Sequence, residues 1–188
     1  MKSQLAVSCC AVAVVALSPA LSGAQGSPPP AAAAPAPPIT VQAVADVYDA
    51  THSRLGVLRF SDTPAGLLVS GVLTALPVGV HGIHIHTVGQ CEAPFTSAGG
   101  HFNPGGVKHG YRNPMGHHSG DMPNITVQPG GAAAVEFLVD GVKLTGPTGL
   151  LDADGAAVVV HAGADDYFTD PAGASGARIA CGVITATK

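Results

Sequence analysis

The chain has 188 residues and a net acidic balance: eight Lys or Arg against twelve Asp or Glu give a formal charge of −4. This balance argues against nucleic acid and against an anionic membrane surface as binding partners. Nine histidines outnumber the lysines and arginines together, which indicates metal chemistry.

The first two dozen residues have the parts of a secretory signal peptide. Lys2 supplies a basic start, residues 5–17 form an uncharged apolar core, and Ser22-Gly23-Ala24 offers small side chains for cleavage. The apolar core is too short to span a bilayer, so residues 1–24 predict export to the periplasm or the extracellular space. Lipoprotein processing at Cys9 is a less favoured alternative. Without this leader the chain keeps seven basic and twelve acidic residues, a net charge of −5.

Residues 25–38 form a Pro/Ala-rich linker without large apolar side chains, which favours an extended, polyproline-like tether. Residues 39–188 then remain as one domain. A chain of about 150 residues buries roughly 68–70% of its unfolded surface, which is enough for a proper core.

Short segments rich in β-branched residues recur through this domain, separated by turn residues. No long apolar face with a helical period accompanies them. The pattern predicts an all-β fold of eight antiparallel strands, arranged as a sandwich or flattened barrel. The predicted strands are residues 39–48, 54–60, 66–75, 79–87, 124–128, 132–139, 156–161 and 178–185.

Two connections, residues 88–123 and 162–177, are too long and irregular to be turns. Loops of this length without secondary structure are usually functional in compact domains. We therefore expect the chemistry to lie on loops that a rigid sheet anchors.

The segment His81-Gly82-Ile83-His84-Ile85-His86 is the most informative stretch of the chain. Side chains two apart on a strand share a face, so His84 and His86 converge while Ile83 and Ile85 point to the opposite side. Convergent imidazoles suit copper or zinc, although an isolated pair of this kind could equally be solvated on an edge strand. Five further potential ligands favour a metal site: His101, His109, His118, Asp121 and His161.

Two cysteines lie outside the leader, Cys91 and Cys181. In an exported protein we expect them to form one disulfide, with two free buried thiols as the alternative. The bond would close a loop of about 90 residues, for which chain entropy gives ~4–5 kcal/mol of stability as an upper figure.

Six motifs follow one another in the domain: residues 84–86 (HIH), 97–104 (SAGGHFNP), 108–110 (KHG), 118–121 (HSGD), 161–166 (HAGADD) and 176–183 (GARIACGV). Together they resemble the copper/zinc superoxide dismutase family, over nearly all of residues 39–188. The wording of residues 110–116 is similar to that of exported bacterial members.

The resemblance implies a Greek-key fold and dismutation of superoxide to O₂ and H₂O₂, with copper and zinc as cofactors. It assigns copper to His84, His86, His101 and His161, and zinc to His101, His109, His118 and Asp121. His101 would thus bridge both metals. Four imidazoles with an open side suit redox-active copper, whereas three imidazoles and a carboxylate suit closed tetrahedral zinc.

Two more roles follow from the resemblance. Asp165 matches the position that links a copper histidine to a zinc histidine; the alternative is a solvated loop residue. Arg178 matches the arginine that attracts the anionic substrate beside the copper channel; the alternative is a surface strand residue. No lysine lies between these two residues, so the substrate-guiding lysines of some relatives lack a counterpart. Oligomeric state does not carry over, and a homodimer stays open.

Other interpretations remain. A metal carrier or store on the same fold would tend to lack copper ligands or the channel arginine, and a copper-only dismutase would lack the zinc ligands. A purely structural module requires that the ligands be vestigial. Of the remaining histidines, His81 is expected to make a structural hydrogen bond, while His52 and His117 fall outside the ligand set.

Overall fold

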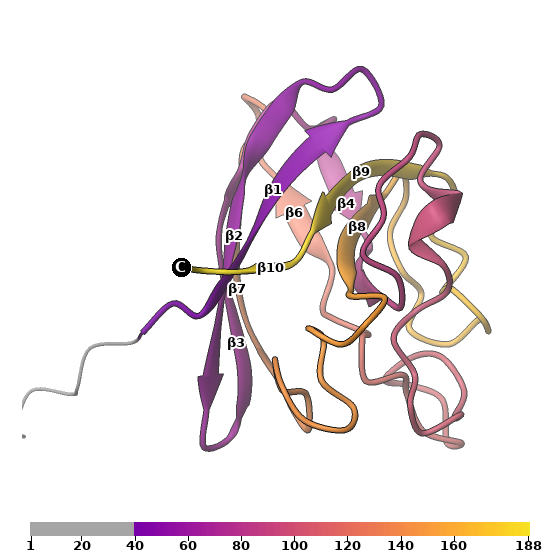
Figure 1. The fold of residues 1–188 in the computed structure, drawn as a ribbon. Coiled ribbons are helices and arrows are strands. Elements are labelled where there is room, and N and C mark those ends of the chain that lie inside the picture. Colours follow the sequence, from indigo (N-terminus) through magenta and orange to yellow (C-terminus); the bar gives the residue numbers. More distant parts are fainter. Residues whose placement is uncertain (1–39) are drawn as a thin grey trace, which may run out of the picture. The chain divides into compact units, whose positions relative to one another are not determined.

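The computed structural model describes residues 40–188. The predicted leader (1–24) and linker (25–38) lie outside the described residues. Figure 1 shows the elements: β1 (Ala43–Asp49), β2 (Arg54–Thr63), β3 (Gly66–Leu73), β4 (Gly79–His81), β5 (Ile83–His86), the 3₁₀ turn η1 (Thr96–Ala98), β6 (Ile125–Val127), β7 (Ala133–Val139), β8 (Ala157–His161), β9 (Arg178–Val183) and β10 (Thr185–Ala186). Within residues 40–188, no helix has the length and apolar character needed to cross a membrane.

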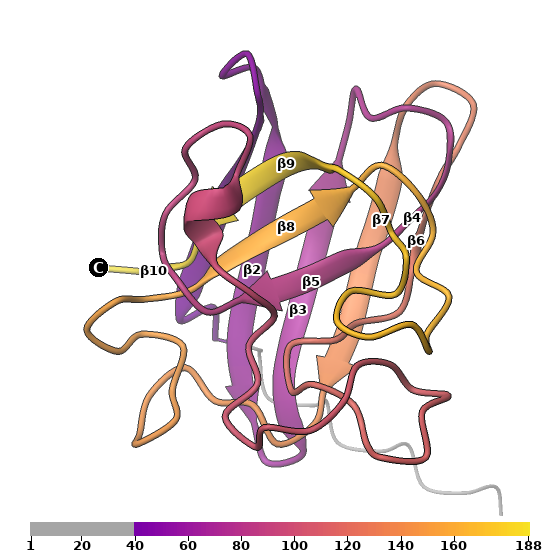
Figure 2. The same ribbon diagram turned by 90° about the vertical axis from the view of Figure 1, so that its right-hand side faces the viewer.

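The strands build one curled antiparallel sheet of eight strands and a separate pair. The large sheet has the order β5-β8-β9-β1-β2-β3-β7, with β10 beside β1, and β4 pairs with β6. The sheet curls so that β5, β8 and β9 lie across from β2, β3 and β7 (Figure 2). This confirms the predicted all-β antiparallel architecture.

The core lies between the two halves of the curled sheet. On β2, Leu58 and Phe60 are fully buried while Arg59 between them is exposed. Facing them across the core are Ile83 and Ile85 of β5, which belong to the same buried cluster. The alternation expected for residues 83–86 is therefore correct: the isoleucines enter the core, which leaves the histidines for the other side of the strand.

Two predicted strands are interrupted, and one long connection was not predicted. Residues 79–87 divide into β4 and β5 because Gly82 leaves the strand pairing and exchanges backbone hydrogen bonds with His161 and Gly163, both at 2.8 Å. Residues 178–185 divide at Ile184, which is buried and donates to the carbonyl of Ala156 at 2.9 Å. Residues 140–156 also form an irregular connection, whose buried apolar side chains fill part of the core.

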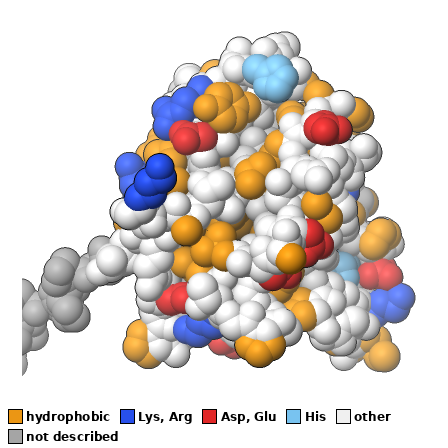
Figure 3. Space-filling model, in the orientation of Figure 1, with side chains coloured by type: hydrophobic (Ala, Val, Ile, Leu, Met, Phe, Trp, Pro, Cys, Tyr) orange, Lys and Arg blue, Asp and Glu red, His pale blue; other side chains and the backbone are white. Residues whose placement is uncertain are grey.

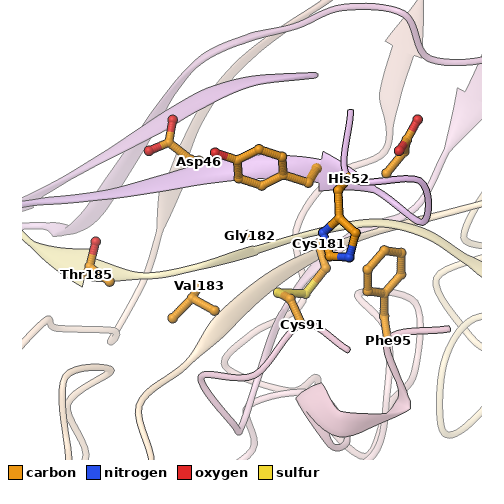
Figure 4. A pocket seen from close by; sticks show the side chains of 10 residues that line it. Asp46, His52, Cys91, Phe95, Cys181, Gly182, Val183 and Thr185 are labelled. Carbon is orange, nitrogen blue, oxygen red and sulfur yellow. A yellow bond between two sulfur atoms is a disulfide. The ribbon is translucent and has the colours of Figure 1, made fainter. Parts of the chain in front are cut away.

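The disulfide between Cys91 and Cys181 is formed, with the two Cα atoms 5.6 Å apart. It fastens the start of the first long loop to β9, next to a small apolar cluster that includes Phe95 and Ala98. A hollow of about 390 Å³ opens beside this bond, with His52 and Phe95 on its walls (Figure 4). The hollow lies apart from the histidine cluster, since none of its lining residues is a candidate metal ligand.

Candidate metal centre

The first long loop returns along the free edge of β5, and this return brings the candidate ligands together. Phe102 N–H donates to the carbonyl of Ile85 at 2.8 Å, and Ile85 N–H donates to Gly120 at 2.9 Å. Bridge pairing then sets His86 opposite His101 and His84 opposite Asp121. A side chain at Gly120 would place its Cβ 2.3 Å from the Ile85 carbonyl oxygen, so this close return requires glycine.

Four imidazoles form the first group: the ligand atoms of His84, His86, His101 and His161 lie within 4.8 Å of one another, and all four side chains are buried. His161 stands at a register shift at the end of β8, where the strand bends out of regular pairing. In each ring one nitrogen has no hydrogen-bond partner among residues 40–188. These atoms are His84 Nδ1, His86 Nε2, His101 Nε2 and His161 Nε2.

In three of these four rings the other nitrogen has a partner outside the two groups of candidate ligands. His86 Nδ1–H donates to the Gly99 carbonyl at 3.0 Å, and His161 Nδ1–H donates to Gly176 at 3.2 Å. His84 Nε2–H donates to Asp165 at 2.8 Å. These bonds fix the tautomers, so the free nitrogens carry lone pairs that point into the group.

The second group surrounds one carboxylate oxygen. The Nδ1 atoms of His101, His109 and His118 lie 2.9, 3.0 and 3.4 Å from Asp121 Oδ1. A tetrahedral metal with ordinary zinc–ligand bonds separates its ligands by about 3.3–3.5 Å, close to these values. Asp121 Oδ2 accepts from the backbone N–H groups of Gly110 and His118, which holds the carboxylate in place.

Buried nitrogens without hydrogen-bond partners show that the site suits two metal ions. Five buried imidazole nitrogens, including His118 Nδ1, have no hydrogen-bond partner within residues 40–188. Each such atom costs roughly 1–3 kcal/mol if nothing binds it. Their lone pairs gather in the two groups described above, so metal coordination is the simplest way to remove the cost.

The electrostatics suit cations. Burial lowers the pKa of His84 to about 4, of His86 to about 2 and of His161 to about 3, which keeps these imidazoles neutral and able to ligate. Burial acts the same way on His109, but the carboxylates of Asp121 and Asp165 outweigh it and raise its pKa to about 9. This second group therefore attracts positive charge.

Asp165 links the two groups. Its Oδ2 accepts from His84 Nε2–H at 2.8 Å, and its Oδ1 accepts from His109 Nε2–H at 3.0 Å. Its backbone is held by Asn124, whose side chain accepts from Asp165 N–H and donates to the Asp165 carbonyl, both at 2.8 Å. The carboxylate therefore fixes one histidine of each group from a single position.

A hollow of about 410 Å³ gives access to the centre, and His101, His118, His161 and Arg178 are among its lining residues. The half-buried Arg178 donates to the carbonyls of Phe95 at 2.5 Å and Gly99 at 2.6 Å, which orient its guanidinium. Nearby Lys108 pairs with Asp170 at 2.8 Å, so its charge is largely balanced. On the face drawn in Figure 3, basic and acidic side chains are scattered among apolar and uncharged ones.

The other histidines have different surroundings. His81 is buried, and its two ring nitrogens lie 2.8 Å from the carbonyl of His161 and 2.9 Å from that of Pro77, which confirms the expected structural hydrogen bond. His117 is exposed beside Tyr111, and His52 is exposed near the disulfide. Sequence reasoning missed Asn124 and Tyr111, whose hydroxyl donates to the Asp121 carbonyl at 2.6 Å. Tyr111 lies within residues 110–116 noted above, but their pattern gives no sign of a contact with Asp121, and Asn124 was given no role.

Comparison with known proteins is consistent across sequence and structure. A family model for copper/zinc superoxide dismutase (SODC) matches residues 55–184. A Cu-Zn superoxide dismutase of Deinococcus radiodurans is 43% identical over 156 residues, covering 76% of this chain and 83% of the relative. One of Caulobacter vibrioides is 44% identical over 134 residues, with coverage of 69% and 77%. The crystal structure of a SOD-like protein from Bacillus subtilis matches with a TM-score of 0.72 and 37% identity, covering 74% of this chain and 96% of that chain. This chain belongs to the copper/zinc superoxide dismutase family.

Proposed function

We propose that the protein dismutes superoxide, with copper held by His84, His86, His101 and His161, and zinc held by His101, His109, His118 and Asp121. The carrying observation is that His101 belongs to both groups: its Nδ1 lies 2.9 Å from Asp121, while its Nε2 has no protein partner among residues 40–188. One imidazole can serve two cations only when both of its ring nitrogens are deprotonated, which two adjacent dications favour.

Copper held by His84, His86, His101 and His161 would supply one-electron redox chemistry. The protein supplies geometry and protons. His101 Nε2 is placed to take up a proton from solvent and to give it to the reduced substrate, which takes a second proton from solvent and leaves as hydrogen peroxide. Two superoxide ions and two protons thus yield one O₂ and one H₂O₂, so no external reductant is needed.

Substrate capture is assigned to Arg178. Its guanidinium keeps a positive charge and lines the same hollow as His101 and His161. Its hydrogen bonds to Phe95 and Gly99 fix the direction of the remaining donors. A small oxygen anion entering the hollow therefore meets a cation beside the copper ligands.

A metal carrier or store is the competing function. It would not need an oriented cation beside the copper ligands, whereas Arg178 is fixed there by its hydrogen bonds to Phe95 and Gly99. A copper-only dismutase is disfavoured because the second group contains three imidazoles and a carboxylate. We also propose a periplasmic or extracellular location, supported by the leader-like residues 1–24 and the Cys91–Cys181 disulfide.

Replacement of a single copper ligand tests the proposed function. His84→Ala removes one of four imidazoles and should reduce superoxide decay by more than about 100-fold, beyond the loss typical of outer partners. His52→Ala is the matched control, because His52 is an exposed histidine outside both groups. The rate of superoxide decay and the copper content should be measured on each purified, disulfide-intact protein. Near-normal activity with copper retained in His84→Ala would refute the assignment.

A further inference from the structure

Gly173, in the second long loop, lies against the hydrogen bond that joins the two metal groups. A Cβ built on Gly173 would stand 1.8 Å from Asp165 Oδ1 and 2.7 Å from His109 Nε2. These are the two atoms of the 3.0 Å bond between Asp165 and His109. The main chain at residue 173 therefore packs directly on this bond, and a side chain has no room there.

The backbones of Gly173 and Asp165 are both held in place by hydrogen bonds. Gly173 N–H donates to the Thr169 carbonyl at 2.6 Å, and the Gly173 carbonyl accepts from Asp166 N–H at 2.9 Å. On the other side, Asn124 holds the backbone of Asp165 through both its N–H and its carbonyl. An added methyl group would thus push on the Asp165 carboxylate, whose Oδ1 also accepts from Tyr167 N–H at 2.6 Å, because side-chain torsions turn more easily than the fixed backbone.

We propose that Gly173 is a positioning residue for the metal centre: the absence of a side chain there lets the Asp165 carboxylate reach His84 and His109 together. The bare backbone also covers the Asp165–His109 bond from one side. A displaced carboxylate would release both rings, so one substitution would weaken zinc binding and alter the copper surroundings. This inference rests on the metal assignments proposed above.

The test compares Gly173→Ala with Gly141→Ala. Both glycines have left-handed backbones, with φ of +64° and +68°, so alanine meets similar strain at each. A Cβ at Gly141 has nothing within 4 Å, and the residue lies outside the centre. Zinc affinity, measured by competition with a chromophoric chelator, should fall about 10–100-fold in Gly173→Ala, as for other outer partners of metal ligands. Gly141→Ala should keep the affinity of the parent protein.

A double variant separates positioning through Asp165 from a general packing defect. In an Asp165→Ala background the 1.8 Å clash with the carboxylate is gone and only the 2.7 Å approach to His109 Nε2 remains, so adding Gly173→Ala should lower zinc affinity by a smaller factor than it does in the parent protein. The Cu(II) electron paramagnetic resonance spectrum of Gly173→Ala should shift toward that of Asp165→Ala. If Gly173→Ala alone does not fold, the double variant should fold and bind zinc like Asp165→Ala.

Three outcomes would overturn the inference. The first is a zinc affinity in Gly173→Ala equal to that in Gly141→Ala. The second is a double variant whose loss of zinc affinity is the full product of the two single-variant losses. The third is a double variant that also fails to fold. Failure of the proposed function has a different signature. It would appear as an absence of dismutation by the copper- and zinc-loaded parent protein, whatever the four variants do to zinc affinity.

Discussion

Three imidazoles of the centre, those of His84, His86 and His161, each bond one nitrogen to the protein, while the other nitrogen has no partner within residues 40–188. The protein-facing bonds end on Asp165, Gly99 and Gly176 respectively. Because each ring is fixed by its outer partner, the lone pairs converge without help from the metal. His101 differs, since its two nitrogens face the two separate groups.

Arg178 carries the prediction that belongs to the residue scale. Without the predicted leader (1–24) the chain is net negative at −5, so the overall field opposes an anionic substrate, and Lys108 is balanced by Asp170. Attraction by one guanidinium across a partly wet channel is on the order of 1–2 kcal/mol, or roughly tenfold in rate. Arg178→Ile should lower the superoxide rate by about that factor, and stopped-flow decay over a range of salt concentrations should show a weaker salt dependence.

The matched variant for this prediction is Arg178→Lys, which keeps the charge but not the planar fork. It should recover part of the lost rate, with metal content equal in all three proteins. Unchanged activity and salt slope in Arg178→Ile would mean that the guidance comes from another group, with Lys108 and Arg112 as the next candidates.

At the scale of elements, the site exists because irregular segments are fastened to the edge of a regular sheet. The first loop pairs with β5 through Phe102 and Gly120, and the second loop contacts the first through Lys108 and His109, which both donate to Asp170. The Cys91–Cys181 bond fastens the start of the first loop to β9. The same part of the loop contains the carbonyls of Phe95 and Gly99, which accept hydrogen bonds from Arg178. The loops are thus held in place by the sheet, by the disulfide and by hydrogen bonds to each other.

The disulfide gives the prediction at this scale. Replacing both Cys91 and Cys181 by Ser should lower the free energy of unfolding by up to ~4–5 kcal/mol, since the bond closes a loop of 90 residues. Denaturant unfolding of the metal-free protein measures this, because metal binding then adds no stability of its own. Reductant should destabilise the parent protein and leave the double variant unchanged. Equal unfolding midpoints for the oxidised parent and the variant would contradict the expectation.

At the scale of the whole molecule, the sequence predicted the all-β architecture and both functional loops because strand periodicity and ligand spacing are local signals. It did not predict the break at Gly82, because the partners of that residue, His161 and Gly163, lie about eighty positions away in the chain. Asn124 and Gly173 were missed for the same reason. Their importance comes from contact with Asp165, which only the folded chain creates.

The long connection at residues 140–156 shows another limit of sequence patterns. Val142, Leu144 and Leu150 are buried there without strand periodicity. Their side chains fill part of the core, and no alternation of apolar and polar residues in the sequence predicts this burial.

The central claim is that one imidazole, that of His101, lies between two different metals. Anomalous X-ray diffraction from crystals of the copper- and zinc-loaded protein, recorded on either side of each metal's absorption edge, tests it most directly. We expect a copper peak among His84, His86, His101 and His161, and a zinc peak among His101, His109, His118 and Asp121. A single peak, or two peaks of which one does not adjoin His101, would contradict the account.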